Sequence, residues 1–578
     1  GRIAVLQFHG APDREHPWVH TPPERFAQYL KFLHDERYRV IALRDLAQFV
    51  DAEKEPSDPF AVIEKRKADR GEFMVDGQIK DAATGQALAA RVYIRGENGK
   101  WHFPKSAARE GSAVRYERRS GFNTNAVEMH TTFSAHPFHL ELPAGRYTFT
   151  LERGKEYFPE IREAIIGREP LKLSFELRRW INMAERGWYS GDAHNHRDPA
   201  ELPNVMLAED VNVGLPMIDW TTVSTVAPAA SDRGFRGQFD GAAVSLDATH
   251  VWYPRNTEYE IFRTGESNHT LGAFLIVNHR TRFEMPVLPL KAVAEKARAE
   301  GALIDLEKHN WPWSIAIVPL LKVDLFELAN NHHWEVGYSL KGWAEPAPPW
   351  MGVGTGTDTE RDWTLYGFQT YYSLLNCGFR LRPTAGTANG VHPVPLGYSR
   401  VYVQLDGAFS YDAWMRGLGA GRSFVTTGPM LLATANGEHP GHAFKQEPAA
   451  RSYLVTGSVL SEQPLESIEF IVNGRLVRRI ASPGQRLATG AYETKIASPI
   501  EVEGTSWMAL RCFEARAGGR IRFAHTAPWW VEVEGQPLRP QRQAADWLTQ
   551  RVRGEIERSR GVLSTEALQE YGKALRIY

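Results

Sequence analysis

The chain has 578 residues, which at roughly 150 residues per domain predicts about four domains. Hydrophobic residues make up 43% of it and aromatic residues 11%, which is enough apolar material to exclude a wholly disordered protein. The 68 basic and 69 acidic residues leave a net charge of −1 with no dense basic stripe, so we expect no nucleic-acid partner.

Two further classes of protein are excluded by what the sequence lacks. No run of about 18 apolar residues is present, so we expect no membrane span. The two cysteines, Cys377 and Cys512, exclude a disulfide-built scaffold and a four-cysteine zinc site. The sequence starts at Gly1 and enters an apolar run directly, so we expect the native N-terminus to lie upstream.

Residues 1–50 alternate between short apolar runs and helix signals. Runs over 3–8 and 40–43 predict strands, and a short helix is expected over 46–50. Thr21 is followed by two prolines and a glutamate, which predicts a helix start with Thr21 as its cap. About 50 residues of this kind are too few to close a sheet of their own.

The segment YRVIALRDL, which follows a predicted strand ending near His9, resembles the C-terminal end of NodB-like polysaccharide deacetylases. The metal-binding motifs of that family lie upstream of this segment, so the resemblance implies no deacetylase activity here. We therefore predict a remnant of such an α/β domain over 1–50 and a linker over 51–72.

Residues 73–180 change to an alternation of apolar and polar positions, which is typical of half-buried strands. One hairpin is predicted from 75–79 to 90–94 across a turn at 81–85, and another within 138–149. The phrases GQIKDAATGQALAARVYI and LPAGRYTF look like a carboxypeptidase-regulatory-like β-sandwich, a module that binds or spaces and rarely catalyses.

Residues 185–440 mix short strands with helices, which predicts a distorted, parallel β/α barrel. The predicted strands cover 187–192, 216–219, 274–278, 302–305 and 400–404, and the predicted helices cover 288–300 and 414–419. Residues 450–535 return to strands, with a hairpin at an Asn-Gly turn, and predict a second β-sandwich. Residues 540–578 are expected to be helical. The predicted fold class is therefore multidomain α/β plus all-β, with a barrel flanked by β-sandwiches.

A candidate metal site lies at the end of the first predicted barrel strand, in the string GDAHNH. Alternation along a strand places Asp192, His194 and His196 on one face, so both imidazoles can reach one divalent ion while Asp192 binds or orients. The C-terminal rim of a β/α barrel is where such chemistry is found. A His-x-His pair alone is a weak signal, and the alternative is a partly exposed strand end without a metal.

Several segments in order resemble the PHP (polymerase and histidinol phosphatase) superfamily over residues 185–535: GDAHNH, MLAEDVNVGLPMIDWT, FELANNH, YYSLLNCGFRLRPTAGTANG and AGRSFVTTGP. Within the superfamily they are most similar to the CehA/McbA-type metallohydrolases. The resemblance implies a PHP-like barrel with His194 and His196 as metal ligands.

The other family positions match less evenly. Asp219 falls in the second motif, but Trp220 stands where the family has a histidine. Glu266 matches the family's Gly-x-Glu ligand, and His309 matches its strand-end histidine. The alternatives are a loop carboxylate at Glu266 and, at His309, a core histidine that stacks beside Trp311 and Trp313.

The last family motif, Gly-Ser-Asp-x-His, is replaced by Gly386-Thr-Ala-Asn-Gly390. Both the aspartate and the histidine are absent, which disfavours a two-metal clamp. Two histidines and one carboxylate with an open position are sufficient for a hydrolytic zinc site.

The sequence thus predicts a metal-dependent hydrolase that cleaves an ester, carbamate or phosphoester bond with a metal-activated water of pKa near about 7. The expected metal ligands are His194, His196, Glu266, His309 and Asp219, and the expected catalytic residues are Asp192 and Glu266. We expect zinc or manganese as cofactor, a small-molecule or glycan-linked substrate, and an extracytoplasmic bacterial location. The alternative is a non-catalytic protein with a decayed barrel, whose sandwiches bind carbohydrate or a cell surface. The altered last motif favours the alternative, and the retained GDAHNH favours the hydrolase.

Overall fold

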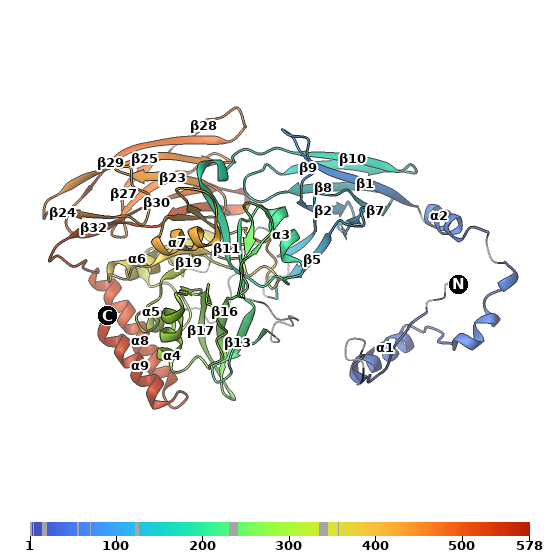
Figure 1. The fold of residues 1–578 in the computed structure, drawn as a ribbon, viewed down its shortest axis with the longest axis horizontal. Coiled ribbons are helices and arrows are strands. Elements are labelled where there is room, and N and C mark those ends of the chain that lie inside the picture. Colours follow the sequence, from blue (N-terminus) through green and yellow to red (C-terminus); the bar gives the residue numbers. More distant parts are fainter. Residues whose placement is uncertain are drawn as a thin grey trace. The chain divides into compact units, whose positions relative to one another are not determined.

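A computed structural model describes residues 3, 5–13, 15, 20–54, 57–69, 71–121, 126–230, 241–334, 345–355, 358–481 and 483–578 (Figure 1). The chain divides into two compact units, Gly1–Glu72 and Phe73–Tyr578. The structure is mixed α/β with several sheets, as the predicted fold class requires. Within the ranges given above, no helix combines the length and the apolar character needed to cross a bilayer.

The first unit consists of helix α1 (Pro23–Asp35), two short 3-10 helices (Leu43–Gln48 and Ala52–Lys54) and helix α2 (Pro59–Asp69). The residue that caps α1 is Pro22, so the predicted Thr21 cap is wrong. The strands predicted over 3–8 and 40–43 are not formed by the described residues there, and residue 4 lies outside them. Val40 and Leu43 are 68% exposed each, because no neighbouring strand in the described part of this unit covers them.

The second unit begins with two sheets that enclose one apolar core. One sheet has the order β10-β1-β7-β4 and the other the order β5-β6-β2-β8-β9, with β3 beside β2. The bounds are β1 (Glu72–Asp81), β2 (Ala90–Gly96), β3 (Trp101–His102), β4 (Lys105–Ser106), β5 (Ala113–Arg119), β6 (Val127–Phe133), β7 (Phe138–Pro143), β8 (Gly145–Glu152), β9 (Glu160–Ile166) and β10 (Leu171–Leu177).

Both hairpins predicted in this region are wrong, because consecutive strands pass from one sheet to the other. β1 pairs in parallel with β10, whereas β2 pairs with β8. β7 pairs with β4, whereas β8 also pairs with β9. The predicted alternation is correct: Leu142 of β7 and Phe149 of β8 enter the same core from opposite sheets. A period of two shows which face is buried but not which strand lies alongside.

A 12-stranded sheet runs through the rest of the unit in the order β14-β15-β12-β11-β21-β22-β31-β30-β26-β27, with β24 and β32 paired beside β30. Its central strands are buried on both faces: Val401 and Val403 of β21 pack in one core, and Tyr402 packs in another. The bounds are β11 (Trp188–Asn195), β12 (Val213–Pro216), β14 (Val244–Ser245), β15 (Val251–Trp252), β21 (Arg400–Gln404), β22 (Ser423–Thr426), β24 (Ala443–Gln446), β26 (Ser467–Val472), β27 (Arg475–Ile480), β30 (Ser506–Ala515), β31 (Ile521–Thr526) and β32 (Trp529–Val533).

A six-stranded sheet, β13-β16-β17-β18-β19-β20, faces this large sheet across the first of those cores. Its strands are β13 (Asp219–Val223), β16 (Thr257–Thr264), β17 (Ser267–Val277), β18 (Leu303–Leu306), β19 (Leu325–Ala329) and β20 (Arg382–Ala385). Helices of the region are α3 (Leu202–Glu209), α4 (Leu290–Glu300), α5 (Ser314–Leu321), α6 (Glu360–Asn376) and α7 (Tyr411–Ala420).

In the region for which a parallel barrel was predicted, the structure has two sheets that contain both parallel and antiparallel pairs. The β18–β19 and β19–β20 pairs are parallel, whereas the β16–β17 and β17–β18 pairs are antiparallel. Within the described residues the strand orders form no closed ring. The strand predicted over 216–219 is wrong: β12 ends at Pro216 and β13 starts at Asp219, because the chain leaves one sheet there and enters the other.

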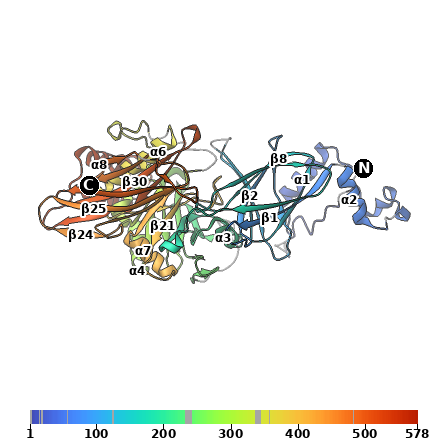
Figure 2. The ribbon, with the colours of Figure 1, turned by 90° about the horizontal axis from the view of Figure 1, so that it is seen from above.

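The C-terminal region adds a four-stranded sheet and two helices. Strands β23 (Met430–Ala435), β25 (Arg451–Ser461), β29 (Tyr492–Val502) and β28 (Gln485–Arg486) cover the second face of the large sheet (Figure 1). In the view from above, β25 overlaps β24 and β30 of that sheet (Figure 2). Asn473 and Gly474 join β26 to β27 with φ of 51° and 80°, which confirms the predicted turn. Helices α8 (Arg542–Ser559) and α9 (Thr565–Ile577) pack on α5 (Figure 1). Strand β22 lies before the border predicted at 440–450 and strand β31 lies after it, and the two pair in the large sheet. The large sheet therefore contains strands from both predicted domains, and the predicted domain borders stay predictions.

Candidate metal centre

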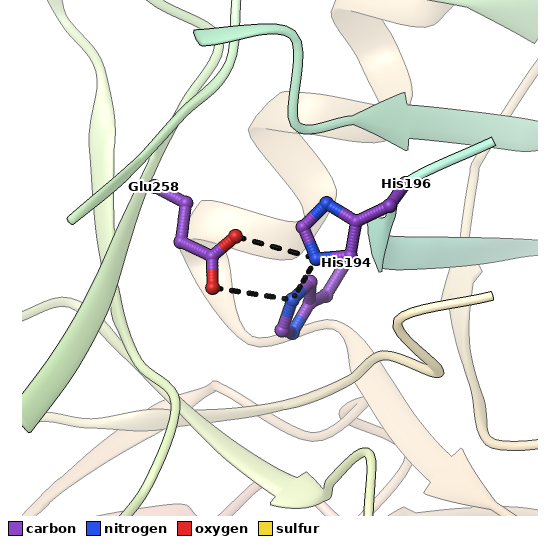
Figure 3. Close-up of side chains that lie close together, drawn as sticks. All are labelled: His194, His196 and Glu258. Atoms are coloured by element: carbon purple, nitrogen blue, oxygen red, sulfur yellow. Dashed lines mark hydrogen bonds and ion pairs between the residues drawn. The ribbon is translucent and has the colours of Figure 1, made fainter. Parts of the chain in front are cut away.

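Strand β11 places His194 and His196 on one face, as their spacing predicts. All residues of β11 are buried, because its strand neighbours β12 and β21 place it inside the sheet and both faces of the sheet are covered: Ala193 packs in one core and Trp188 in the other. The two Nε2 atoms lie 3.1 Å apart, and the ring planes are inclined by 86°. Both nitrogens therefore face one point (Figure 3).

Glu258 of β16 adds a third donor, which the sequence analysis missed. Its carboxylate oxygens lie 3.3 Å from Nε2 of His196 and 3.8 Å from Nε2 of His194 (Figure 3). The ligand atoms of the three residues lie within 4.8 Å of one another and could hold a metal ion. The sequence did contain a signal, because Glu258 and Glu260 alternate along a strand whose neighbours are apolar, and carboxylates are seldom buried there without a cation.

Glu327 of β19 orients His194 from the opposite edge of the ring. Its carboxylate lies 3.2 Å from Nδ1 of His194. Burial lowers the pKa of His194 to about 4, so the ring is neutral near pH 7. When Nδ1–H donates to Glu327, Nε2 keeps its lone pair toward His196 and Glu258. Burial raises the pKa of Glu327 well above its usual value, and the charge of Lys308 opposes this rise.

A second donor group uses the same ring. His194, Glu307 and Glu327 also have ligand atoms within 4.8 Å of one another, and His194 approaches both carboxylates through Nδ1. A neutral imidazole has one lone pair, so His194 can serve only one of the two groups. The hydrogen bond from Nδ1 to Glu327 favours the group that contains Glu258.

Asp192, expected to be catalytic, supports the strand instead of facing the donors. Its carboxylate accepts hydrogen bonds from Oγ1 of Thr387 at 2.5 Å, the backbone N–H of Gly397 at 2.9 Å and the backbone N–H of His194 at 3.1 Å. Burial raises the pKa of Asp192, and these hydrogen bonds oppose the rise. Asp192 is therefore a positioning residue that holds the backbone of the His-x-His segment.

The altered last motif lies directly against the same segment. The backbone N–H of Ala388 donates to the carbonyl of His194 at 2.7 Å, and the N–H of His196 donates to the carbonyl of Asn389 at 2.7 Å. A Cβ at Gly390 would lie 2.4 Å from the carbonyl oxygen of His196, so this backbone has no room for a side chain there. The segment therefore supports the backbone of the His-x-His segment, and none of its side chains belongs to the donor groups found among the described residues.

Asp219 and Glu266 do not join the donor cluster. Asp219 forms a two-point ion pair with Arg282, the shorter contact being 2.7 Å, and burial raises its pKa. In the parallel β13–β16 pair Trp220 lies opposite Glu258, so its side chain is on the same face of the sheet as that carboxylate. Glu266 is fully exposed at the turn between β16 and β17 and pairs with Arg263 at 3.2 Å, so it lies apart from the donor cluster, and its role as a ligand stays a prediction.

His309 is buried in an aromatic environment, as the alternative interpretation of this residue proposed. Its ring centroid lies 4.7 Å from that of Trp363 and 4.8 Å from that of Tyr366. Neither ring nitrogen has a hydrogen-bond partner, and burial lowers the pKa of His309 to about 3. His309 belongs to none of the donor groups found among the described residues, so its role as a ligand stays a prediction.

The buried charge of the cluster fits a divalent cation. Glu258, Glu307 and Glu327 are each at most 1% exposed, and an ionised carboxylate out of water costs several kcal/mol unless a cation or hydrogen bonds compensate it. Oxygen Oε2 of Glu307 has no hydrogen-bond partner. Two imidazole nitrogens and a carboxylate are the donor set of zinc sites that keep an open position, and nitrogen and oxygen donors also suit manganese.

Comparison with known proteins adds little to this geometry. No family model matches the sequence, and no curated protein matches it. A solved structure that resembles the chain is a two-domain protein from Bacteroides vulgatus, described as containing a predicted PHP-like metal-dependent phosphoesterase. The two are 9% identical with a TM-score of 0.28, over 59% of this chain and 94% of the other. A likeness this low carries no weight for fold or function.

Proposed function

We propose that this chain is a divalent-metal-dependent hydrolase that cleaves an ester, carbamate or phosphoester bond. The observation that carries the proposal is the convergence of His194, His196 and Glu258, three buried donors from two sheets, on one point. Zinc or manganese held there would supply a Lewis acid that polarises the scissile group and lowers the pKa of water.

The chain's own residues prepare this site in three ways. Glu327 holds His194 in the tautomer that keeps Nε2 available. Asp192 and the 386–390 segment fix the backbone of the His-x-His segment. Burial lowers the pKa of His194 to about 4, so its ring is neutral near pH 7. A histidine must be neutral at the nitrogen that binds a metal ion.

The order of the sequence motifs supports assigning residues 185–440 to a degenerate PHP-type domain of the CehA/McbA kind. It also supports a carboxypeptidase-regulatory-like module over 73–180 and a NodB-like remnant over 1–50. A small-molecule or glycan-linked substrate and an extracytoplasmic location belong to the same proposal.

A non-catalytic metal-binding or carbohydrate-binding protein is the second candidate. The specific observation in its favour is the last motif, where Ala388 and Gly390 stand in place of the aspartate and histidine of the family. In this case the donor cluster would stabilise the fold and turn over no substrate.

Hydrolysis assays on the full chain separate the two candidates. The protein is reconstituted with Mn²⁺ or Zn²⁺ and tested on a nitrophenyl ester, a nitrophenyl carbamate and a nitrophenyl phosphodiester, with and without a chelator. We expect turnover of at least one of them that is lost with the chelator and in His194→Ala, but retained in Glu266→Gln. Bound metal without turnover of any of the three would support the binding protein.

A further inference from the structure

Lys308 lies next to the donor cluster and was not singled out by the sequence analysis. It follows β18, is 4% exposed, and its backbone carbonyl accepts a hydrogen bond from the hydroxyl of Ser314. Its Nζ lies 4.8 Å from the ring centroid of Trp311, so the ammonium is covered by an aromatic face.

The ammonium of Lys308 is seated among carboxylates. It contacts Glu307 directly and lies 3.4 Å from a carboxylate oxygen of Glu260. Glu258, Glu260 and Glu307 form a third donor group, with oxygens within 4.8 Å of one another. Lys308 therefore pairs with two of the three carboxylates that could otherwise hold a second cation.

Glu258 belongs both to this carboxylate group and to the group with His194 and His196. Two cations that share Glu258 lie close together, and an ammonium beside a second divalent ion would be strongly repelled in a site with little water. Nδ2 of Asn331 donates to Glu307 at 3.1 Å, which helps to hold that carboxylate in place for the lysine.

We infer that Lys308 is a built-in counter-cation that occupies the second cation position, so that the site binds one divalent ion at His194, His196 and Glu258. The inference rests on the proposed metal-dependent function. It explains why the buried Glu307 and the partly buried Glu260 lie beside a site with ligands for a single ion: they hold the lysine.

The experiment is a count of bound metal on the full chain. Wild type, Lys308→Met and Lys308→Arg are equilibrated with Mn²⁺ or Zn²⁺ and desalted, and metal per chain is measured by inductively coupled plasma mass spectrometry, with folding checked by circular dichroism. We expect one ion in wild type, two in Lys308→Met, and one in Lys308→Arg, which keeps the charge. The double variant Lys308→Met/Glu260→Gln is expected to return to one ion.

Other ion counts would overturn either the role of Lys308 alone or the metal-dependent function as well. Two ions in wild type, or one in folded Lys308→Met, would overturn the role of Lys308 and leave the metal-dependent function standing. No ion in wild type would overturn both.

If Lys308→Met does not fold, Glu260→Gln decides the matter. The variant is expected to keep one ion at wild-type affinity, since Glu260 serves the lysine. Loss of the ion would show that Glu260 is itself a ligand and would overturn the inference.

Discussion

The end of β11 and the 386–390 segment lie against each other, yet of these two only the first contributes side chains to a donor group that could hold a metal ion. His194 and His196 present two converging nitrogens, whereas Ala388 and Gly390 offer no donor. The backbone contacts of the segment remain, with hydrogen bonds to the carbonyl of His194 and from the amide of His196. The difference shows that a segment without donor side chains can still hold the backbone of neighbouring donors in position through its own backbone.

The strongest way to test this comparison is to remove a donor. Glu258→Ala removes the carboxylate of the donor group that contains His194 and His196. We expect metal affinity to fall by more than about 100-fold, because a loss of about 10- to 100-fold is typical of residues that only orient a ligand. Titration calorimetry with Mn²⁺ or Zn²⁺ measures the loss. Glu266→Gln is the matched control and should bind as wild type, because Glu266 is fully exposed.

A smaller loss is expected when the orienting carboxylate is changed. Glu327→Gln keeps the shape of the side chain but removes the charge that favours Nδ1–H on His194, so metal affinity should fall about 10- to 100-fold. The same titration measures it. An affinity loss as large as that of Glu258→Ala would show that Glu327 itself binds the ion.

His309 provides a test of whether a buried histidine outside the donor cluster acts only by packing. The unfolded ring, with a pKa near 6.5, takes up a proton as the pH falls, whereas the folded ring stays neutral because its pKa is about 3. The unfolded state therefore binds more protons, and between pH 7 and pH 5 this ring should lower the free energy of unfolding by about 2 kcal/mol.

His309→Phe should remove that part of the acid sensitivity while leaving bound metal unchanged. Denaturant unfolding at pH 7 and pH 5, beside metal analysis, checks both statements. An unchanged difference between the two pH values, or lost metal, would contradict the packing role.

The smallest effect is expected in the supporting segment. Thr387→Val removes the hydroxyl that donates to the buried carboxylate of Asp192, and a hydrogen bond to a charged group contributes about 1.5 kcal/mol. We expect a loss of that size in the free energy of unfolding, with the metal still bound. Thr387→Ser keeps the hydroxyl and should restore most of the stability. If Thr387→Val unfolds like wild type, the segment does not support β11.

Much of this architecture could be predicted from local patterns. The spacing of His194 and His196 indicated a shared face, and the Asn473-Gly474 turn was correct to the residue. Strand partners could not be predicted, because β1 and β2 alternate in the same way but belong to different sheets.

The sequence signal at Glu258 could not by itself decide between Glu258 and Glu266 as the carboxylate donor, for a similar reason. Glu258 and Glu266 lie in or beside the same hairpin, and only the pairing of β16 with β13 and β17 shows which of them faces inward. Lys308 gave no signal, since its role depends on carboxylates that come from strand β16 and from the end of β18, which the sequence does not show to be neighbours.

Anomalous diffraction from crystals of the full chain grown with Zn²⁺ or Mn²⁺ tests the central claim most directly. The account predicts one strong peak about 2.0–2.2 Å from Nε2 of His194, Nε2 of His196 and a carboxylate oxygen of Glu258. No peak there, or a peak held by Nδ1 of His194 with Glu307 and Glu327, would contradict it.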